Sequence, residues 1–314
     1  MSAVFRHALV TGGAGFIGSR LVRRLLDRGL EVSVLDNFSV GERDAIDPRA
    51  QVHGGDVCSR ADTERALKGV DCVFHLAAKV SIRNSFEKFY DDVNTNLMGT
   101  MNLLRCLDPR VVRHFALASS MAVYADSPSE APIPESHTQR PLAPYGASKL
   151  ASEQICSLIL GQAGIPFYAL RYFNTYGPGQ KFTPYVGVIT IFTTRLLRGE
   201  PPVIFGDGEQ ARDLVHVEDI VSGTAATLNA PAGTYNLGTG RATTVNQLAG
   251  LLIRRIDPSA MQVYAPAQAG EMRFAVADIT AAAQKLGYRP ERSLEQEIGA
   301  VIEWIRLSLQ VGVG

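Results

Sequence analysis

Short runs of apolar residues alternate with stretches in which apolar residues recur every three or four positions through the first half of the chain. Short runs bounded by turn residues are typical of buried strands, and the longer periodic stretches are typical of amphipathic helices. The predicted strands cover residues 7–11, 31–35, 51–53, 71–76 and 114–118. The predicted helices cover residues 21–26, 62–68, 90–107 and 145–162. This alternation predicts an α/β fold with a Rossmann-type, doubly wound parallel sheet and right-handed crossovers.

The second half is richer in Pro and Gly and alternates less regularly. Its composition predicts a loop, an apolar helix, a short strand with a turn, a second helix, another strand and a third helix. In the same order these elements cover residues 174–180, 186–197, 202–208, 210 onward past 219, 233–237 and 244 onward. We expect a smaller, mixed α/β C-terminal lobe that follows the large sheet.

Composition excludes several classes of protein. The 31 basic side chains balance 31 acidic ones, so neither nucleic acid nor an anionic membrane is an expected partner. No apolar run approaches about 18 residues, and the N-terminus lacks a signal-peptide pattern. The four cysteines are far apart, as in reduced cytoplasmic proteins, and the six histidines lack metal-ligand spacing. We therefore expect a cytoplasmic protein with no metal site.

Three glycines, Gly12, Gly15 and Gly18, lie between the first predicted strand and the first predicted helix. Glycine lets the backbone approach a pyrophosphate closely, and a helix N-terminus offers N–H groups and partial positive charge. Asp36 ends the next strand, about 20 residues on, where a carboxylate can bind both hydroxyls of an adenosine ribose. An acid here repels a 2′-phosphate, so NAD is favoured over NADP. The alternative is that Asp36 is only a turn residue at a strand end.

Tyr145 and Lys149 lie four residues apart at the start of a predicted helix that follows Pro144. This spacing places both on one helix face, where an ammonium group is expected to lower the pKa of the phenol and make it a usable general base. The pair alone is a weak pattern, and the alternative is a solvated helix face. Support comes from Gly12, Asp36, Ala77 and Ser120, which all lie at predicted carboxyl ends of strands. Ligands bind at that edge of a parallel sheet.

These motifs together resemble the extended short-chain dehydrogenase/reductase family. They are residues 11–18, 76–78, 119–120, the Tyr145–Lys149 pair and residues 171–174. The chain is most similar to nucleotide-sugar epimerases and dehydratases, especially UDP-hexose 4-epimerases. The resemblance implies tightly held NAD and catalytic roles for Ser120, Tyr145 and Lys149. It also implies a set of cofactor contacts: Gly12, Gly15, Phe16, Ile17, Gly18, Asp36, Asn37, Asp56, Val57, Leu76, Ala77, Ala78, Lys79, Asn96, Tyr145, Lys149 and Tyr172.

The resemblance places an NAD-binding domain at residues 1–174, with later segments returning to it, and a mainly nucleotide-sugar-binding lobe at residues 175–314. Arg212 is the strongest candidate for the diphosphate, because a guanidinium binds phosphate oxygens in a bidentate fork. The alternative is an ion pair with Asp213. The implied substrate contacts are Ser81, Ser120, Asn174, Val188, Phe205, Arg212 and Arg273.

Two departures from the family pattern concern the same region. The related epimerases carry a second diphosphate arginine where this chain has Gln268, and Arg273 is the nearest replacement in sequence. The residue that gates the sugar C2 substituent aligns with Ala275, beside Phe274. A side chain this small leaves room for an N-acetyl group.

The expected activity is 4-epimerisation of a UDP-hexose, either UDP-glucose/galactose or the N-acetyl analogues, through a transient 4-keto intermediate. Met121 and Ala122 stand where dehydratases have an acid pair, so 4,6-dehydration is not expected. The alternatives are another nucleotide-sugar enzyme of the family (a reductase, a decarboxylase or an epimerase at another carbon) and an NAD-binding sensor without catalysis. The resemblance also implies a homodimer through a four-helix interface made by helices 90–107 and 145–162. The alternative is that these helices pack only on their own sheet.

Overall fold

A seven-stranded sheet, parallel throughout, organises the computed structural model, which describes residues 5–80, 84–127, 130–181, 187–267 and 272–310. The strand order is β11-β6-β5-β4-β1-β2-β3. Strand β1 lies between β2 and β4, so the chain direction across the sheet reverses at β1. The strands are β1 (His7–Thr11), β2 (Glu31–Asp36), β3 (Gln51–Gly54), β4 (Cys72–His75), β5 (Phe115–Ser120), β6 (Phe167–Tyr172) and β11 (Gly233–Leu237).

Helices cover both faces of this sheet because alternate strand residues point to opposite sides. Leu9 of β1 joins a core with α2 (Arg60–Ala66), α5 (Gly99–Arg105) and α6 (Pro144–Ala163). Its neighbours Ala8 and Val10 join a second core with residues of three other helices. These helices are α1 (Gly18–Asp27), α8 (Val217–Ala226) and α10 (Thr280–Leu286). The predicted Rossmann-type architecture is therefore confirmed.

Helix α6 carries its polar side chains inward. Pro144 occupies the first turn, and the helix ends at Gly164, which adopts the left-handed conformation with φ of 70°. The buried face is formed by Tyr145, Gly146, Ser148, Lys149, Ser152, Glu153, Cys156 and Leu160. Leu158 and Ile159 are instead 70% and 46% exposed. A helix normally buries its apolar stripe. Helix α6 instead buries several polar side chains and exposes part of its apolar surface.

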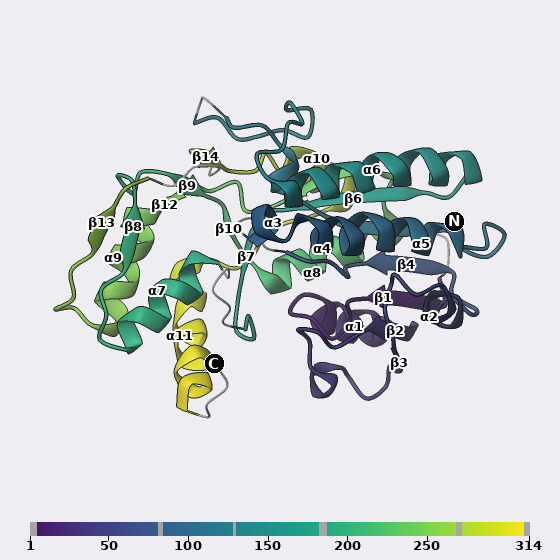
Figure 1. Ribbon diagram of the computed structural model, residues 1–314, viewed down its shortest axis with the longest axis horizontal. Helices are drawn as coiled ribbons and strands as arrows, with labels where there is room; N and C mark the ends of the chain where they lie inside the picture. The colour runs from purple at the N-terminus through teal and green to yellow at the C-terminus, as the bar shows by residue number, and fades with distance from the viewer. Residues whose placement is uncertain (1–4, 81–83, 128–129, 182–186, 268–271, 311–314) are drawn as a thin grey trace.

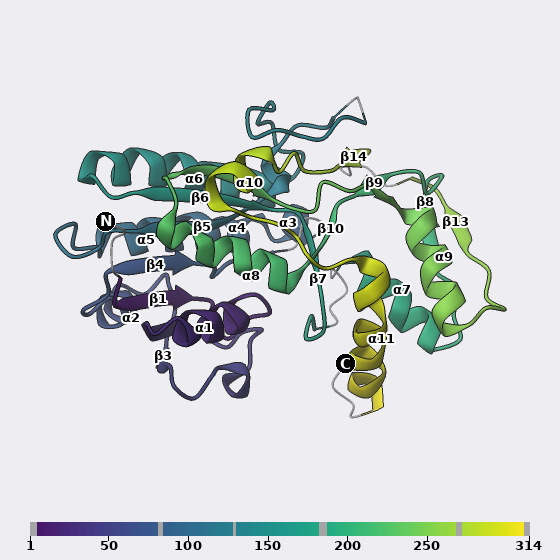
Figure 2. The same cartoon turned by 180° about the vertical axis from the view of Figure 1, so that it is seen from behind.

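The smaller lobe lies beside the sheet in Figures 1 and 2. Its core is formed by α7 (Val188–Leu197), α9 (Val245–Ile256) and α11 (Leu294–Gln310). Four short strand pairs complete it: β10 (Leu214–His216) with β7 (Asn174–Tyr176), β13 (Val263–Ala265) with β8 (Val203–Phe205), and β9 (Ala211–Arg212) with both β12 (Thr243–Thr244) and β14 (Phe274–Ala275). Helices α8 and α10 and strand β11 return to the large sheet, so the chain passes between the lobes repeatedly.

Two predictions about elements are wrong. Residues 90–107 form no single regular helix, because α4 (Phe89–Val93) and α5 are joined by a π-helical turn, η2 (Asn94–Met98). In that turn the Asn96 carbonyl accepts a hydrogen bond from Ser152 of α6 at 2.9 Å. The predicted loop at 174–180 begins with strand β7, whose parallel partner β10 lies about 40 residues away. Strand β6 was also not predicted.

Within the described parts of the chain, none of the helices combines the length and apolarity needed to cross a bilayer. All four cysteines are free. In the same described segments, no group of three His, Cys, Asp or Glu side chains is arranged to hold a metal ion.

Candidate active site

Strand β5 and helix α6 bring the three predicted catalytic residues together. Ser120 is the last residue of β5, and its hydroxyl lies beside the phenol of Tyr145 in the first turn of α6, where it favours the phenolate. Lys149 follows one turn later and is only 3% exposed. Its ammonium donates to the carbonyl oxygen of Ala118 at 2.9 Å. The strand end therefore fixes both the hydroxyl and the ammonium group.

Burial dominates the proton affinity of both α6 side chains. It raises the pKa of Tyr145 to about 12, against the opposing effect of the Ser120 hydrogen bond, and the Asp92 carboxylate adds to the rise. Burial also lowers the pKa of Lys149 to about 8, although its electrostatic interactions with Glu153, Cys156 and Asp92 oppose this. The prediction that Lys149 lowers the pKa of Tyr145 is wrong for this arrangement. The ammonium is directed at the Ala118 carbonyl, and the cost of burying a phenolate outweighs the favourable contacts.

The glycine turn after β1 leaves no room for side chains. Gly12 has φ of 69°, and a Cβ there would lie 2.8 Å from the Ala77 nitrogen. A Cβ on Gly18 would lie 2.1 Å from the Gly12 carbonyl oxygen. The amide of Gly15 donates to the same oxygen at 3.1 Å. Phe16 and Ile17 then lead into α1, whose N-terminal N–H groups face the turn. Bare backbone at a helix N-terminus fits a dinucleotide pyrophosphate.

The carboxylate of Asp36 is held in place at the end of β2. One oxygen accepts from the Ala14 amide at 2.9 Å, and the other accepts from the Phe38 amide at 2.8 Å. A carboxylate oriented in this way retains acceptor capacity for ribose hydroxyls. Nearby, the side-chain amide of Asn37 donates to the carboxylate of Asp56 at 2.9 Å. Val57 is buried next to them. This end of the sheet fits the adenosine part of NAD.

The carboxyl ends of β1 and β4 are locked to each other. The hydroxyl of Thr11 accepts from the amides of Leu76 and Ala77, each at 3.2 Å. Ala78 and Lys79 follow, and the side chain of Asn96 bonds to both the amide and the carbonyl of Lys79, at 2.8 and 3.1 Å. Lys149 lies at this edge of the sheet with three N–H donors, of which one has an acceptor among the described residues. The spare donors fit the hydroxyls of a nicotinamide ribose.

Comparison with known proteins agrees with this geometry. The profile of the NAD dependent epimerase/dehydratase family matches residues 8–238 of this chain. The chain belongs to this family. A putative UDP-glucose 4-epimerase of Methanocaldococcus jannaschii is 36% identical over 95% of this chain and 98% of its own length. A UDP-glucuronic acid decarboxylase of Arabidopsis thaliana is 33% identical over 95% of this chain and 69% of its own length.

The fold agrees equally well with a solved member of the family. The structure of UDP-glucose 4-epimerase from Thermotoga maritima, determined with UDP-glucose, superimposes with a TM-score of 0.91 at 36% identity. The match covers 96% of this chain and 99% of that one. The cofactor of the epimerase/dehydratase family is NAD, and the glycine turn, Asp36 and Lys149 described above fit it.

One predicted cofactor residue has its polar group engaged elsewhere. The hydroxyl of Tyr172, at the end of β6, hydrogen-bonds to Thr224 of α8 at 2.7 Å. Any contact of Tyr172 with NAD would therefore use the ring or the backbone.

The predicted substrate residues are spread over the smaller lobe of this epimerase/dehydratase family member. Ser81 and Gln268 lie outside the described residues. Asn174 begins β7, and its Oδ1 is buried without a hydrogen-bond partner among the described residues. Val188 begins α7 and Phe205 ends β8. Buried oxygens without a hydrogen-bond partner are rare. Among the predicted substrate residues, Asn174 is therefore a candidate for binding a polar ligand.

The two predicted substrate arginines differ in their surroundings. Arg212 lies on β9 and donates to the carbonyl of Ala211 at 2.9 Å. The guanidinium of Arg273 makes a bidentate contact with Asp207 at 2.7 and 2.9 Å. Arg273 is thus already paired with a carboxylate. Ala275, two residues on, is fully buried in β14.

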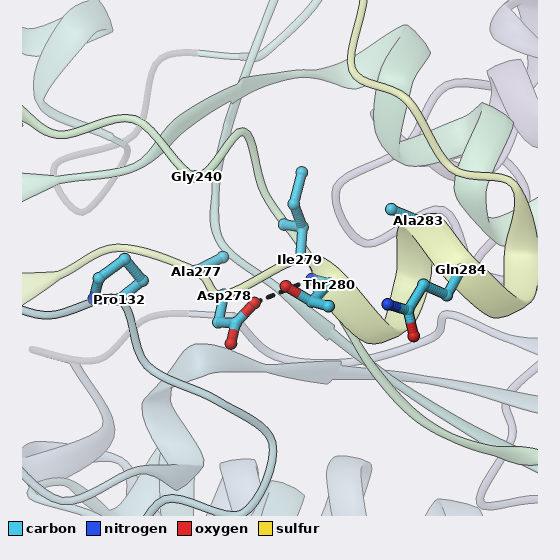
Figure 3. Close-up of a pocket in the computed structure, with 8 residues that line it drawn as sticks. All are labelled: Pro132, Gly240, Ala277, Asp278, Ile279, Thr280, Ala283 and Gln284. Atoms are coloured by element: carbon cyan, nitrogen blue, oxygen red, sulfur yellow. Dashed lines mark hydrogen bonds between the residues drawn. The ribbon is translucent and has the colours of Figure 1, made fainter.

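A concavity elsewhere on the molecule contains none of the predicted site residues. It is lined by the loop at Pro132, by Gly240 and by the start of α10 (Figure 3). The dashed line in Figure 3 joins Thr280 and Asp278, whose carboxylate caps α10 by accepting from the Thr280 amide at 2.9 Å. This concavity is separate from the residues around Tyr145.

Sequence reasoning missed a buried charge pair behind the catalytic residues. Arg171 of β6 makes a bidentate contact with Glu153 of α6, at 3.0 and 2.7 Å. Glu153 also accepts a hydrogen bond from Ser119, the neighbour of Ser120. A four-residue step from Lys149 to Glu153 places both on one helix face, and this spacing could have revealed the connection. The second residue missed is Asp92, four positions before Asn96.

Proposed function

We propose that this protein is an NAD-dependent UDP-sugar 4-epimerase that inverts C4 of a UDP-hexose through a transient 4-keto sugar. The observation that carries the proposal is the grouping of Ser120, Tyr145 and the buried Lys149 at the sheet edge that fits NAD. Two of the similar proteins named above are UDP-glucose 4-epimerases or are described as putative ones. The work of this site is proton transfer at a sugar hydroxyl.

Tyr145 acts as the general base that takes the proton from the sugar 4-hydroxyl and later returns it. The Ser120 hydroxyl favours the phenolate form of Tyr145. Lys149 supplies a buried positive charge one turn along the same helix face. NAD, when bound, supplies reversible acceptance of a hydride from the sugar carbon. Because the proton and the hydride both return, the reaction is an isomerisation with no net oxidation.

The predicted ligand contacts become part of this proposal. Gly12 to Gly18, Asp36, Asn37, Asp56 and Val57 contact the adenosine diphosphate side of NAD, and residues 76–79, Asn96, Lys149 and Tyr172 contact the nicotinamide side. Residues 1–174, with later segments that return to them, form the cofactor domain, and residues 175–314 form mainly the substrate lobe. We assign the cytoplasm as its setting, since free thiols persist there.

The substrate contacts are proposed on weaker grounds. Arg212 and Asn174 are the residues proposed to hold the diphosphate and sugar, with Val188 and Phe205 along the nucleotide and with Ser81 near the sugar. Arg273 joins them only if it leaves Asp207. The small side chain of Ala275 is the ground for proposing that N-acetylhexosamines are accepted, and the sugar would have to reach this residue, which is fully buried in β14.

The proposed assembly is a homodimer through α4, η2, α5 and α6. Exposed apolar side chains gather on these elements: Phe89, Tyr90, Met98, Met101, Leu158 and Ile159. Other apolar residues of the helices expected to pair, Leu104 and Ile155, instead pack in or against the core of their own subunit. Water-exposed apolar patches of this kind mark interaction surfaces.

The test is an NMR time course with UDP-glucose, UDP-N-acetylglucosamine and UDP-glucuronate, without added NAD. Appearance of a galacto isomer is the expected result, and the substrate that reacts identifies the sugar. The Tyr145→Phe variant is the control, and its turnover should fall by orders of magnitude while its circular dichroism stays unchanged. Failure of all three sugars to react, even after NAD is supplied, would overturn the proposal.

One alternative has a specific observation in its favour, namely the similarity to a UDP-glucuronic acid decarboxylase. The same NMR experiment separates the two activities. Conversion of UDP-glucuronate to a UDP-pentose with release of carbon dioxide would support decarboxylation, whereas a UDP-hexuronate isomer would support epimerisation.

A further inference from the structure

A carboxylate lies buried beside the catalytic helix without the partners that a buried charge normally has. Asp92 belongs to α4, which packs against α6, and it is only 4% exposed. Its Oδ2 has no hydrogen-bond partner among the described residues. A buried carboxylate without such a partner is costly. The stability of α4 therefore does not explain why a carboxylate is buried at position 92.

The position of Asp92 on its helix explains what it faces. It lies one turn before Asn96, whose side chain bonds to the backbone of Lys79 and to the hydroxyl of Ser148 at 3.1 Å. Ser148 is the residue before Lys149 on α6. The face of α4 and η2 that carries Asp92 and Asn96 is therefore directed at the segment after β4 and at the catalytic turn of α6.

The charged groups around this carboxylate come from three elements. Burial raises the pKa of Asp92, Lys79 and Lys149 oppose this rise by favouring the carboxylate, and Asp91 adds to it. Lys149 is in turn influenced by Glu153 and Cys156 of its own helix. Glu153 is already held by Arg171 in a bidentate ion pair at 2.7 Å. Within the described residues Asp92 makes no ion pair, so its carboxylate is available to add to the favourable effect of Glu153 on the Lys149 ammonium.

We propose that Asp92 is a positioning residue of the proposed epimerase site, where its buried carboxylate keeps the Lys149 ammonium charged. It touches neither substrate nor cofactor in this role and acts through Lys149. The inference rests on the proposed function for its catalytic meaning, although the charge relationship itself can be measured without any substrate. The same carboxylate adds to the effect of burial in raising the pKa of Tyr145.

The test measures the titration of Lys149 directly. The full-length, NAD-loaded protein is labelled with carbon-13 at the lysine ε-carbon, and the Lys149 signal is identified by its loss in Lys149→Arg. Burial sets the pKa of Lys149 to about 8, well within the range in which proteins stay folded. In Asp92→Asn the midpoint should fall by about one pH unit, because a favourable opposite charge has been removed. The matched control is Asp91→Asn, which removes the same charge from an exposed neighbour and should leave the midpoint unchanged.

Two further measurements keep the outcomes distinct. Asp92→Ser removes the charge without adding an amide, and should reproduce the shift if Asp92→Asn does not fold. A Lys149 midpoint equal to that of Asp91→Asn in the folded Asp92 variants would overturn the inference. If the wild-type protein epimerises no sugar but the Lys149 midpoint shifts as expected, the proposed function fails and the charge relationship stands. If it does epimerise, the loss of turnover at alkaline pH should begin at lower pH in Asp92→Asn.

Discussion

Arg171 of β6 holds both carboxylate oxygens of Glu153 of α6, and the closer contact, from Nη2 to Oε2, is 2.7 Å long. Both side chains are almost fully buried. The Arg171 guanidinium also donates to the hydroxyl of Tyr124 at 3.0 Å and to the carbonyl of Glu135 at 2.9 Å. One cation thus joins the catalytic helix, the central sheet and the loop that follows β5.

This relationship predicts a large loss of stability when the cation alone is removed. Arg171→Met leaves the Glu153 carboxylate buried and unpaired, which should lower the free energy of unfolding by about 3–5 kcal/mol. Urea denaturation followed by circular dichroism measures it. Arg306→Met is the control, since it breaks an exposed ion pair on α11 and should cost about 1 kcal/mol or less. Equal losses in the two variants would contradict the prediction.

The glycine turn predicts a loss of cofactor without a general loss of folding. In Gly18→Ala the new Cβ would collide with the Gly12 carbonyl, and the turn must shift away from the pyrophosphate position. We expect NAD affinity to fall at least tenfold, measured by isothermal titration after removal of bound cofactor. Gly299→Ala places a methyl group in open space on α11 and should bind NAD as the wild type does. Wild-type affinity in Gly18→Ala would show that the turn does not hold the pyrophosphate.

The pairing of Arg273 with Asp207 predicts unequal roles for the two substrate arginines. Arg212→Ala should weaken UDP binding by about tenfold or more, as expected for the loss of a charged hydrogen bond. Arg273→Ala should change UDP affinity by less than about twofold, because it removes an exposed ion pair worth little. Calorimetric titration with UDP compares them. A larger effect in Arg273→Ala would mean that Arg273 leaves Asp207 and replaces the arginine missing at position 268.

The buried ammonium group predicts the pH dependence of turnover. The pKa of Lys149 is lowered by burial to about 8, so the side chain is charged below this pH and neutral above it. A neutral Lys149 loses its charge and one N–H donor where the nicotinamide ribose is proposed to bind, so kcat/KM should fall as pH rises through about 8. A profile from pH 6 to pH 10 with the reactive UDP-sugar measures it. Constant kcat/KM up to pH 10 would contradict a role for the Lys149 charge.

The exposed apolar face of α6 predicts that the dimer can be broken by one charge. Ile159→Glu should convert the dimer to a monomer, measured by light scattering after size-exclusion chromatography. Leu307→Glu changes a similarly exposed apolar residue on α11 and should leave the dimer intact. A dimeric Ile159→Glu protein, or a monomeric wild type, would exclude this face as the interface.

The parts of the site that follow from local chemistry could be predicted from sequence. Gly12, Gly18 and Asp36 are tied to the ends of short apolar strands, and the face shared by Tyr145 and Lys149 depends only on helical spacing. Properties that depend on distant neighbours could not be predicted. Strand β7 exists because β10 pairs with it, and the π-helical turn accompanies hydrogen bonds from Asn96 to Lys79 and Ser148.

The prediction that the pKa of Tyr145 is lowered was wrong for the same reason. Spacing along one helix identifies Lys149 as a neighbour but gives neither the depth of burial nor the contribution of Asp92 from another helix. Arg171 and Glu153 lie 18 residues apart in sequence and meet only when β6 takes its place beside β5. Charge pairs buried between the sheet and its helices are therefore the part of such a site that is hardest to predict from sequence.

The return of α8 and β11 to the large sheet has a consequence for how the chain can be divided. A fragment that ended at residue 174 would leave β6 as a bare edge strand, because its neighbour β11 is supplied by residues 233–237. It would also uncover α1, against which α8 packs. Exposed edges and apolar helix faces promote aggregation. The two lobes are therefore not separable modules, and an exchange of the smaller lobe between relatives would have to leave residues 217–237 and 280–286 in place.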